Sequence, residues 1–193
     1  MRKIIYNAQT TLNNRIANQD GVFWEPFPWG ETEQAFANQL YAGTDTWVMS
    51  RKMFEAIVPW WDTVAQGSVP EDVPALTDAD LEFARLFSGS KKIAISRTMT
   101  PNDDQDVISG DIVPQLQALK EQPGKDIILA AGPATLHPLL GVPGLIDEML
   151  LVIHPAVIGA GPRLFSDDDL ALRLIEATPF PAGAVVMRYE VLR

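Results

Sequence analysis

The stretch 125-KDIILAAGPATL-136 decides the fold of this chain. Its apolar residues 127–129 are typical of a short buried strand, small residues follow at 130–132, and a helix is predicted to begin at Pro133. A strand that leads through a glycine into a helix brings free backbone N–H groups and the positive end of the helix dipole to one point, which suits a phosphate. Most turns of this kind bind nothing, so the other segments have to decide between a ligand site and a simple turn.

The rest of the chain repeats the alternation of strand and helix. Parallel-type strands are predicted at 3–9, 46–49, 92–96, 127–129 and 149–153, and helices are predicted to begin near residues 31, 50, 77, 112 and 133. The helix that begins at Ser50 is predicted to stop before Pro59, because proline removes a backbone donor. Residues 60–74 and 101–110 are predicted to be irregular.

The chain closes with two segments of alternating polarity, 172–177 and 185–192, which are typical of an antiparallel pair. Helices do not separate these last strands. The sequence therefore predicts an α/β fold with a mostly parallel sheet and an antiparallel edge. No repeat and no linker interrupts it, so we expect one domain that spans residues 1–193.

Composition narrows the class of protein further. The 193 residues are 47% hydrophobic and 21% charged, which is typical of a globular domain. The longest apolar stretch without a charge, 149–162, is too short and too broken by proline and glycine to span a membrane. The chain has no cysteine and two histidines, which excludes thiolate chemistry and leaves little for a metal site. The first ten residues carry no apolar signal core, so we expect a cytoplasmic protein.

The net charge of −10 argues against nucleic acid as a partner, because phosphate backbones require a surplus of Lys and Arg. A small anionic ligand is compatible with this charge if positive residues are concentrated locally. Such residues gather at three places: Arg51 with Lys52, the pair 91–92 with Arg97, and Lys125.

Three predicted strands end in residues that suit phosphate binding. One ends at Ser50 and the basic pair 51–52, one at the triplet 96–98, and one at Gly132. If these strands are neighbours, one anionic ligand would meet two helix N-termini and two arginines. An ordinary solvated loop arginine explains Arg97 equally well. The chain has neither the glycine-rich dinucleotide fingerprint nor the glycine-flanked serine motif of hydrolases.

Five segments together resemble the dihydrofolate reductase-like family that includes the reductase domain of the bacterial bifunctional riboflavin-biosynthesis deaminase–reductase. The two most specific segments are 119-LKEQPGKDIILAAGPATL-136 and 144-GLIDEMLLVIHPAVIGAGPRLF-165. The other three are 1-MRKIIYNAQTTLNNRIA-17, 45-DTWVMSRKMFEAI-57 and 91-KKIAISRTM-99. They occur in the family's order and cover nearly the whole chain, which is similar to the single-domain members.

The resemblance implies a three-layer α/β/α fold of the dihydrofolate reductase type, a homodimer, and NADPH as the cofactor lying across the strand ends. It implies that Ser50, Arg51 and Lys52 meet phosphate, and that Ser96, Arg97 and Thr98 hold the phosphate of the adenosine ribose. It also implies that the pyrophosphate lies against Ala131, Gly132, Pro133, Ala134, Thr135 and Leu136.

This sequence departs from the family pattern at several of these positions. Asn13 and Asn14 stand where the family usually has Asp-Gly, so the acidic residue that orients substrate is absent and an amide replaces it. Ser50 and Ala131 each replace a glycine, and Pro133 removes one N–H donor at the helix start.

The predicted substrate site lies in the long loop after the first strand. Asn13 is the candidate substrate contact and Trp24 the candidate aromatic wall over the substrate; a turn residue and a loop anchor are the alternatives. We therefore expect an NADPH-dependent reductase of a small heterocyclic substrate, similar to a pyrimidine reductase or a dihydrofolate reductase. The alternative function is a nucleotide- or ligand-binding protein on the same fold that has no turnover.

Overall fold

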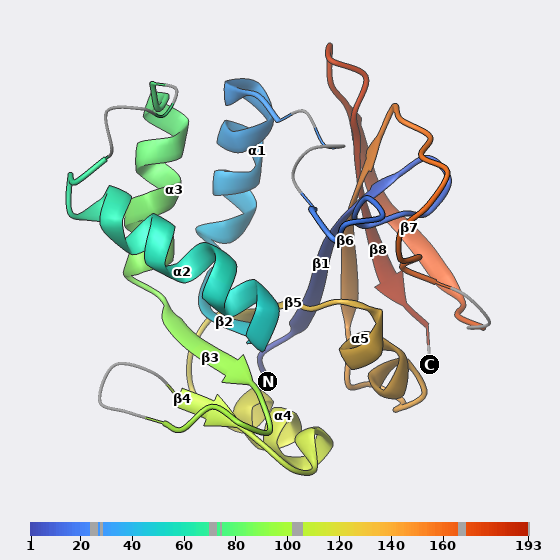
Figure 1. Ribbon diagram of the computed structural model, residues 1–193. Helices are drawn as coiled ribbons and strands as arrows, with labels where there is room; N and C mark the ends of the chain where they lie inside the picture. The colour runs from blue at the N-terminus through green and yellow to red at the C-terminus, as the bar shows by residue number, and fades with distance from the viewer. Residues whose placement is uncertain are drawn as a thin grey trace.

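The computed structural model describes residues 1–23, 27, 29–69, 73, 75–101, 106–165 and 169–192 (Figure 1). Its strands are β1 (Ile4–Thr11), β2 (Thr44–Ser50), β3 (Lys91–Ile95), β4 (Asp106–Ile108), β5 (Asp126–Ala130), β6 (Glu148–His154), β7 (Leu172–Pro179) and β8 (Val185–Val191). Its helices are α1 (Glu31–Tyr41), α2 (Arg51–Ala65), α3 (Asp78–Ser88), α4 (Ile112–Glu121) and α5 (Pro133–Leu140).

The strands form one sheet in the order β4-β3-β2-β5-β1-β6-β8-β7. In this order, the neighbouring strands β4, β3, β2, β5, β1 and β6 are all parallel to one another. Strand β8 is antiparallel to β6, and β7 is antiparallel to β8. This arrangement confirms the predicted fold class, including the antiparallel C-terminal edge. In Figure 1 the β7–β8 pair stands at one side of the molecule and β3–β4 at the other.

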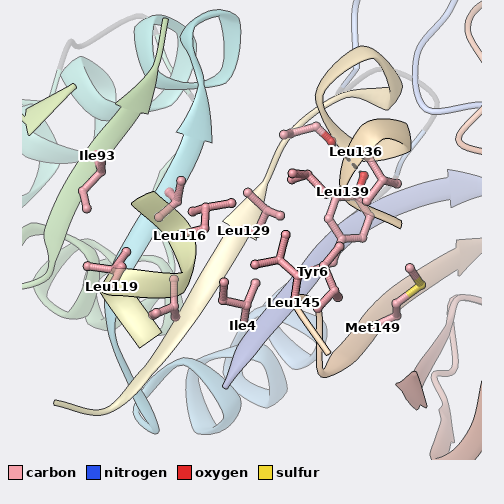
Figure 2. Close-up of a cluster of buried hydrophobic side chains, with 14 of the residues drawn as sticks. Ile4, Tyr6, Ile93, Leu116, Leu119, Leu129, Leu136, Leu139, Leu145 and Met149 are labelled. Atoms are coloured by element: carbon pink, nitrogen blue, oxygen red, sulfur yellow. Dashed lines mark hydrogen bonds between the residues drawn. The ribbon is translucent and has the colours of Figure 1, made fainter. Parts of the chain in front are cut away.

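Helices cover both faces of the sheet because the central strands alternate their side chains between two apolar layers. Ile4 and Tyr6 of β1 point into a layer with Leu116 of α4 and Leu136 of α5 (Figure 2). Ile5, between them, points into the opposite layer. That second layer includes residues of α1, α2 and α3, namely Phe36, Leu40, Phe54, Val58, Phe83 and Phe87.

Helix α2 corrects one of the sequence predictions. It continues through Pro59 to Ala65 instead of stopping before the proline. A proline inside a helix costs about 3 kcal/mol, but the apolar face of α2 extends beyond it: Val64 is buried, and Trp61 packs against Phe83 of α3 with ring centroids 4.7 Å apart. Burial of this longer face outweighs the cost of the missing N–H.

A second correction concerns the segment 101–110, which was expected to be irregular throughout. Its residues 106–108 form the short edge strand β4, paired in parallel with β3. Three residues are too few to produce an alternating pattern, and the strand forms because β3 offers it an unpaired edge. The helix predicted to begin near residue 77 is confirmed as α3, at whose start Thr77 and Asp80 form a capping box.

In the described part of the chain, no helix is both long enough and apolar enough to cross a membrane.

Candidate functional site

The three strand ends that the sequence singled out are neighbours in the structure. Strand β2 lies between β3 and β5, and all three are parallel. Ser50 is paired with Ile95 of β3, and Met49 with Ala130 of β5. The residues that follow these strands therefore meet at one carboxyl edge, which is where open α/β sheets bind ligands.

Two helices start at this edge without a side-chain cap. Ser50 and Gly132 are the N-cap residues of α2 and α5, and neither helix start has a side-chain cap hydrogen bond. By contrast, Thr77 caps α3 and Asp111 caps α4 through their side chains. The N-termini of α2 and α5 thus keep the donors and the partial positive charge that attract an anion.

The turn from β5 into α5 has room for a ligand beside its backbone. A Cβ atom added to Gly132 would meet nothing within 4 Å. The N–H groups of Thr135 and Leu136 already donate to the Gly132 carbonyl, at 3.0 and 3.1 Å. Because Pro133 has no N–H, the exposed Ala134 offers the remaining first-turn donor.

The other residues of this turn have structural roles. Leu136 is fully buried in the apolar layer beneath α5, so only its backbone faces the turn. The carbonyl of Ala131 accepts a 2.7 Å hydrogen bond from the Tyr6 hydroxyl, and burial raises the pKa of that hydroxyl. This bond ties the end of β5 to β1 and fixes the position of the turn.

The loop after β3 is organised around its hydroxyl groups. The buried Ser96 Oγ accepts hydrogen bonds from the backbone of Thr98 at 3.2 Å and of Met99 at 3.0 Å. The Thr98 hydroxyl accepts a hydrogen bond from Arg51, whose guanidinium also pairs with Glu55. Both hydroxyls therefore shape the loop.

Arg97 lies between these two hydroxyl residues, with its side chain exposed. Within the described ranges no hydrogen bond or ion pair engages its guanidinium, whereas Arg51, the neighbouring arginine, is already paired. A guanidinium that is always charged and unpaired at a strand end can bind a phosphate through two parallel hydrogen bonds. Its position fits the predicted contact with the adenosine ribose phosphate.

The basic residue beside Arg51 extends across the edge. Lys52 donates from Nζ to the Gly21 carbonyl at 3.2 Å, which links α2 to the loop that follows β1. Trp24, the candidate aromatic wall in the same loop, lies outside the described residues. Its predicted contact with substrate stays a prediction.

Asn13, the candidate substrate contact, makes a paired interaction with the chain segment after β6. Its Nδ2 donates to the Ile158 carbonyl at 2.8 Å, and its Oδ1 accepts from the Ile158 N–H at 3.3 Å. Its Oδ1 also accepts from the Thr11 hydroxyl at 2.7 Å. The amide therefore connects two loops, and its contact with substrate stays a prediction.

Asn14 makes the same kind of pair one residue later. Its side-chain amide donates to the Phe165 carbonyl at 2.7 Å and accepts from the Phe165 N–H at 3.3 Å. Its backbone has φ of 65°, the left-handed conformation that glycine adopts most easily. This finding explains why asparagine stands where the family usually has glycine.

The segment that these asparagines hold comes very close to the loop after β1. Gly161 has φ of +116°, and a Cβ at this position would lie 2.1 Å from the Ala17 carbonyl oxygen. Ile16 donates to the Pro162 carbonyl at 3.1 Å, and Arg15 donates to the Gly161 carbonyl. We call residues 11–17 and 156–165 the paired loops.

A buried histidine lies beside the paired loops. His154, the last residue of β6, is fully buried, and its Nε2 lies 2.8 Å from Oε1 of Gln9. Phe27 and Trp29 surround its ring, with centroids 4.8 and 6.1 Å away. Burial lowers the pKa of His154 to about 4, although Glu33 opposes the shift. The sequence did not indicate a site role for this residue, because a histidine before a proline at a strand end is interpreted most simply as an ordinary strand histidine.

A cavity of about 240 Å³ lies at the opposite end of the sheet, and its lining includes Thr44, Asp126 and Arg188. Thr44 and Asp126 begin β2 and β5, so this cavity is far from the candidate edge. Within the described ranges, no group of three or more His, Asp or Glu side chains is placed to hold a metal ion.

The three-layer fold with its antiparallel C-terminal edge is that of dihydrofolate reductase-like proteins. The family model of the RibD C-terminal domain matches residues 2–186, and the chain belongs to this family. Membership supports a reductase-like function of the riboflavin pathway. The resemblance inferred from the five sequence segments is thereby confirmed.

Known proteins that are similar to this chain include one relative in sequence and two in fold. The uncharacterized protein YyaP of Bacillus subtilis (strain 168) is 32% identical over 196 residues, which cover 98% of this chain and 95% of YyaP. A pyrimidine reductase-like protein from Corynebacterium diphtheriae has a TM-score of 0.66 at 17% identity, covering 100% of this chain and 92% of that one. Dihydrofolate reductase from Enterococcus faecalis, in complex with NADP(H), has a TM-score of 0.63 at 11% identity, covering 99% and 97%. The two solved structures establish the likeness of fold.

Proposed function

We propose that this chain, as one domain of residues 1–193, binds NADPH across the carboxyl ends of β3, β2 and β5 and reduces a small heterocyclic substrate. The observation that carries the proposal is the exposed Arg97, which has no partner among the described residues and lies at the same sheet edge as two helix starts without side-chain caps. Three anion-binding features at one edge suit a ligand with several phosphate groups.

Each feature suits a different part of the cofactor. Arg97 would bind the phosphate of the adenosine ribose, and the N–H of Ala134, next to the open backbone of Gly132, would bind the pyrophosphate. Arg51 and Lys52 would contribute positive charge between these two phosphate sites. A reduced nicotinamide supplies the hydride when it is bound, whereas the protein orients the reactants and excludes water.

The substrate would lie toward the ends of β1 and β6. Asn13, at the mouth of this region, and Trp24 stay the predicted substrate contacts. The solved relative from Corynebacterium diphtheriae is described as pyrimidine reductase-like, and the sequence resemblance points to the same chemistry. An aminopyrimidine related to 5-amino-6-(5-phosphoribosylamino)uracil is therefore the first substrate to test.

One observation favours a second function, ligand binding without turnover. The family's acidic residue is replaced by Asn13, whose amide is bonded to Ile158 and carries no charge. If that carboxylate is needed for proton transfer, the chain would bind nucleotide and substrate but leave the substrate unchanged.

An assay of NADPH oxidation with a panel of aminopyrimidines and pteridines tests the proposal. We expect turnover with at least one member and an increase in melting temperature with NADPH alone. A melting shift without oxidation would support the binding function. No shift with any nucleotide would contradict both functions.

Two further expectations have tests of their own. We expect a homodimer, because β7 is an edge strand and exposes Leu174 and Ile175. Sedimentation at micromolar concentration would contradict this expectation if it gave a monomer. We also expect the protein in the cytoplasm, which cell fractionation would check.

A further inference from the structure

His154 carries a polar atom that nothing in the candidate cofactor site uses. Its ring is 0% exposed, and in the described part of the chain its Nδ1 has no hydrogen-bond partner. A buried polar atom without a partner costs about 1–3 kcal/mol, and native proteins keep few of them. This atom lies at the carboxyl end of β6, beside the end of β1.

The hydrogen bond on the other side of the ring defines what Nδ1 can do. Oε1 of Gln9 faces Nε2, and the tautomer that makes a hydrogen bond there carries its hydrogen on Nε2 and leaves Nδ1 with its lone pair. Burial holds the pKa of His154 near 4, and Glu33 of α1 is the charged group that acts on it. The ring is therefore neutral at physiological pH, with Nδ1 as an acceptor.

The surroundings of the ring favour a flat partner. Phe27 lies against the imidazole with ring planes tilted by 31°, and Trp29 with planes tilted by 55°. An unpaired acceptor beside aromatic rings suits a planar heterocycle that carries an N–H donor.

We infer that Nδ1 of His154 accepts a hydrogen bond from an N–H group of the heterocyclic substrate and thereby selects for substrates with such a donor. This inference rests on the proposed function, because it assigns a specificity residue to the substrate region. Since Nδ1 is buried, the ligand ring has to exchange places with a neighbouring side chain. Phe27 is the neighbour best suited to this exchange, because its ring is the closer of the two that flank His154.

The histidine ring nitrogens give a direct test, because the chain has only two histidines. The full-length protein, labelled with 15N-histidine, is titrated with 5,6-diaminouracil, which has several N–H donors, and with 1,3-dimethyluracil, which has none. We expect the Nδ1 resonance of His154 to shift with the first probe alone, while the resonances of His137 stay in place. An unchanged Nδ1 resonance at millimolar 5,6-diaminouracil, or an equal shift with both probes, would overturn the inference.

Two variants separate the hydrogen bond from the packing. His154→Phe keeps a flat ring beside Phe27 and Trp29 but removes the acceptor, and His154→Asn keeps an acceptor at the δ position. We expect the dissociation constant for 5,6-diaminouracil to rise at least tenfold in His154→Phe and to recover in part in His154→Asn, with the NADPH dissociation constant unchanged in both. A rise of less than twofold in a folded His154→Phe variant would contradict the role of Nδ1.

The outcome is distinguishable from failure of the proposed function. If the wild-type protein oxidises no NADPH, the reductase proposal fails, but the resonance shift and the dissociation constants still decide whether His154 binds the heterocycle. If NADPH is oxidised and His154 does not respond, the inference alone fails.

Discussion

The two halves of the carboxyl edge are built in opposite ways. At β3, β2 and β5, the backbone around Gly132 is open, two helix starts lack side-chain caps, and the guanidinium of Arg97 has no partner among the described residues. At β1 and β6, the paired loops are joined by two side-chain amides that each bond both ways to a backbone peptide. Unused donors mark the first half, and satisfied donors mark most of the second.

This difference shows where each half gets its specificity. The open half, at β3, β2 and β5, can recognise an anion through charge and exposed N–H groups. Such recognition requires little shape complementarity between the site and the ligand. The paired half holds a fixed shape, and its few unsatisfied atoms, such as Nδ1 of His154, are individually informative. Resemblance to the family at a given position is therefore weaker evidence of ligand contact at β1 and β6, the paired half, than at β3, β2 and β5, the open half.

The largest contrast is expected between two glycine substitutions. Gly161→Ala places a Cβ 2.1 Å from the Ala17 carbonyl oxygen in a backbone with φ of +116°, so it should lower the free energy of unfolding by about 3 kcal/mol. Gly132→Ala meets nothing within 4 Å and should leave stability nearly unchanged while weakening NADPH binding. Urea unfolding and nucleotide titration of both variants measure these effects. Equal losses of stability would contradict the contrast.

A smaller effect is expected from the protonation of His154. Because its pKa is lowered to about 4 from an ordinary 6.5, the folded state binds fewer protons, and stability is lost as pH falls from 6.5 toward 4. Between pH 7 and pH 4.5 this loss amounts to about 2 kcal/mol. In His154→Phe the decline in unfolding free energy over this range should be smaller by that amount. A slope identical to that of the wild type would show that the histidine is not held neutral by the fold.

Asn13→Asp, in the paired half, should lower the free energy of unfolding modestly. The substitution replaces the Nδ2 donor to the Ile158 carbonyl with a carboxylate oxygen, so the unfolding free energy should fall by about 1 kcal/mol at neutral pH. The NADPH dissociation constant should not change, because the open half is untouched. Gln39→Glu is the matched control, since that amide is exposed and has no side-chain hydrogen bond within the described ranges. If both variants have the same free energy of unfolding, the hydrogen bonds between Asn13 and Ile158 contribute nothing to stability.

The fold could be predicted from the sequence wherever a segment was long enough to show a clear apolar periodicity. The parallel strands and the antiparallel pair of β7 and β8 follow from such patterns. The continuation of α2 past Pro59 could not, because packing against α3 outweighs a local rule. Strand β4 was missed because three residues carry no period.

Prediction of the site was uneven for a related reason. The residues at Ser50, Arg97 and Gly132 were recognisable because each lies at the end of a strand or within two residues of it, and parallel strands bring such positions together. The partner of Asn13 could not be recognised from the sequence, because Ile158 lies 145 residues away and a hydrogen bond across that distance leaves no local pattern. The surroundings of His154 could not be predicted for the same reason, since its partner Gln9 is equally distant in sequence.

The most direct test of the account is the binding of NADPH and NADH to the wild-type protein and to Arg97→Ala. The two cofactors differ by the phosphate that Arg97 is proposed to bind, and a charged hydrogen-bonded contact of this kind contributes about 1.5–3 kcal/mol. We predict that wild type binds NADPH at least tenfold more tightly than NADH and that Arg97→Ala abolishes this preference by weakening NADPH alone. Equal affinity of the wild type for the two cofactors, or equal losses for both in the variant, would contradict the account.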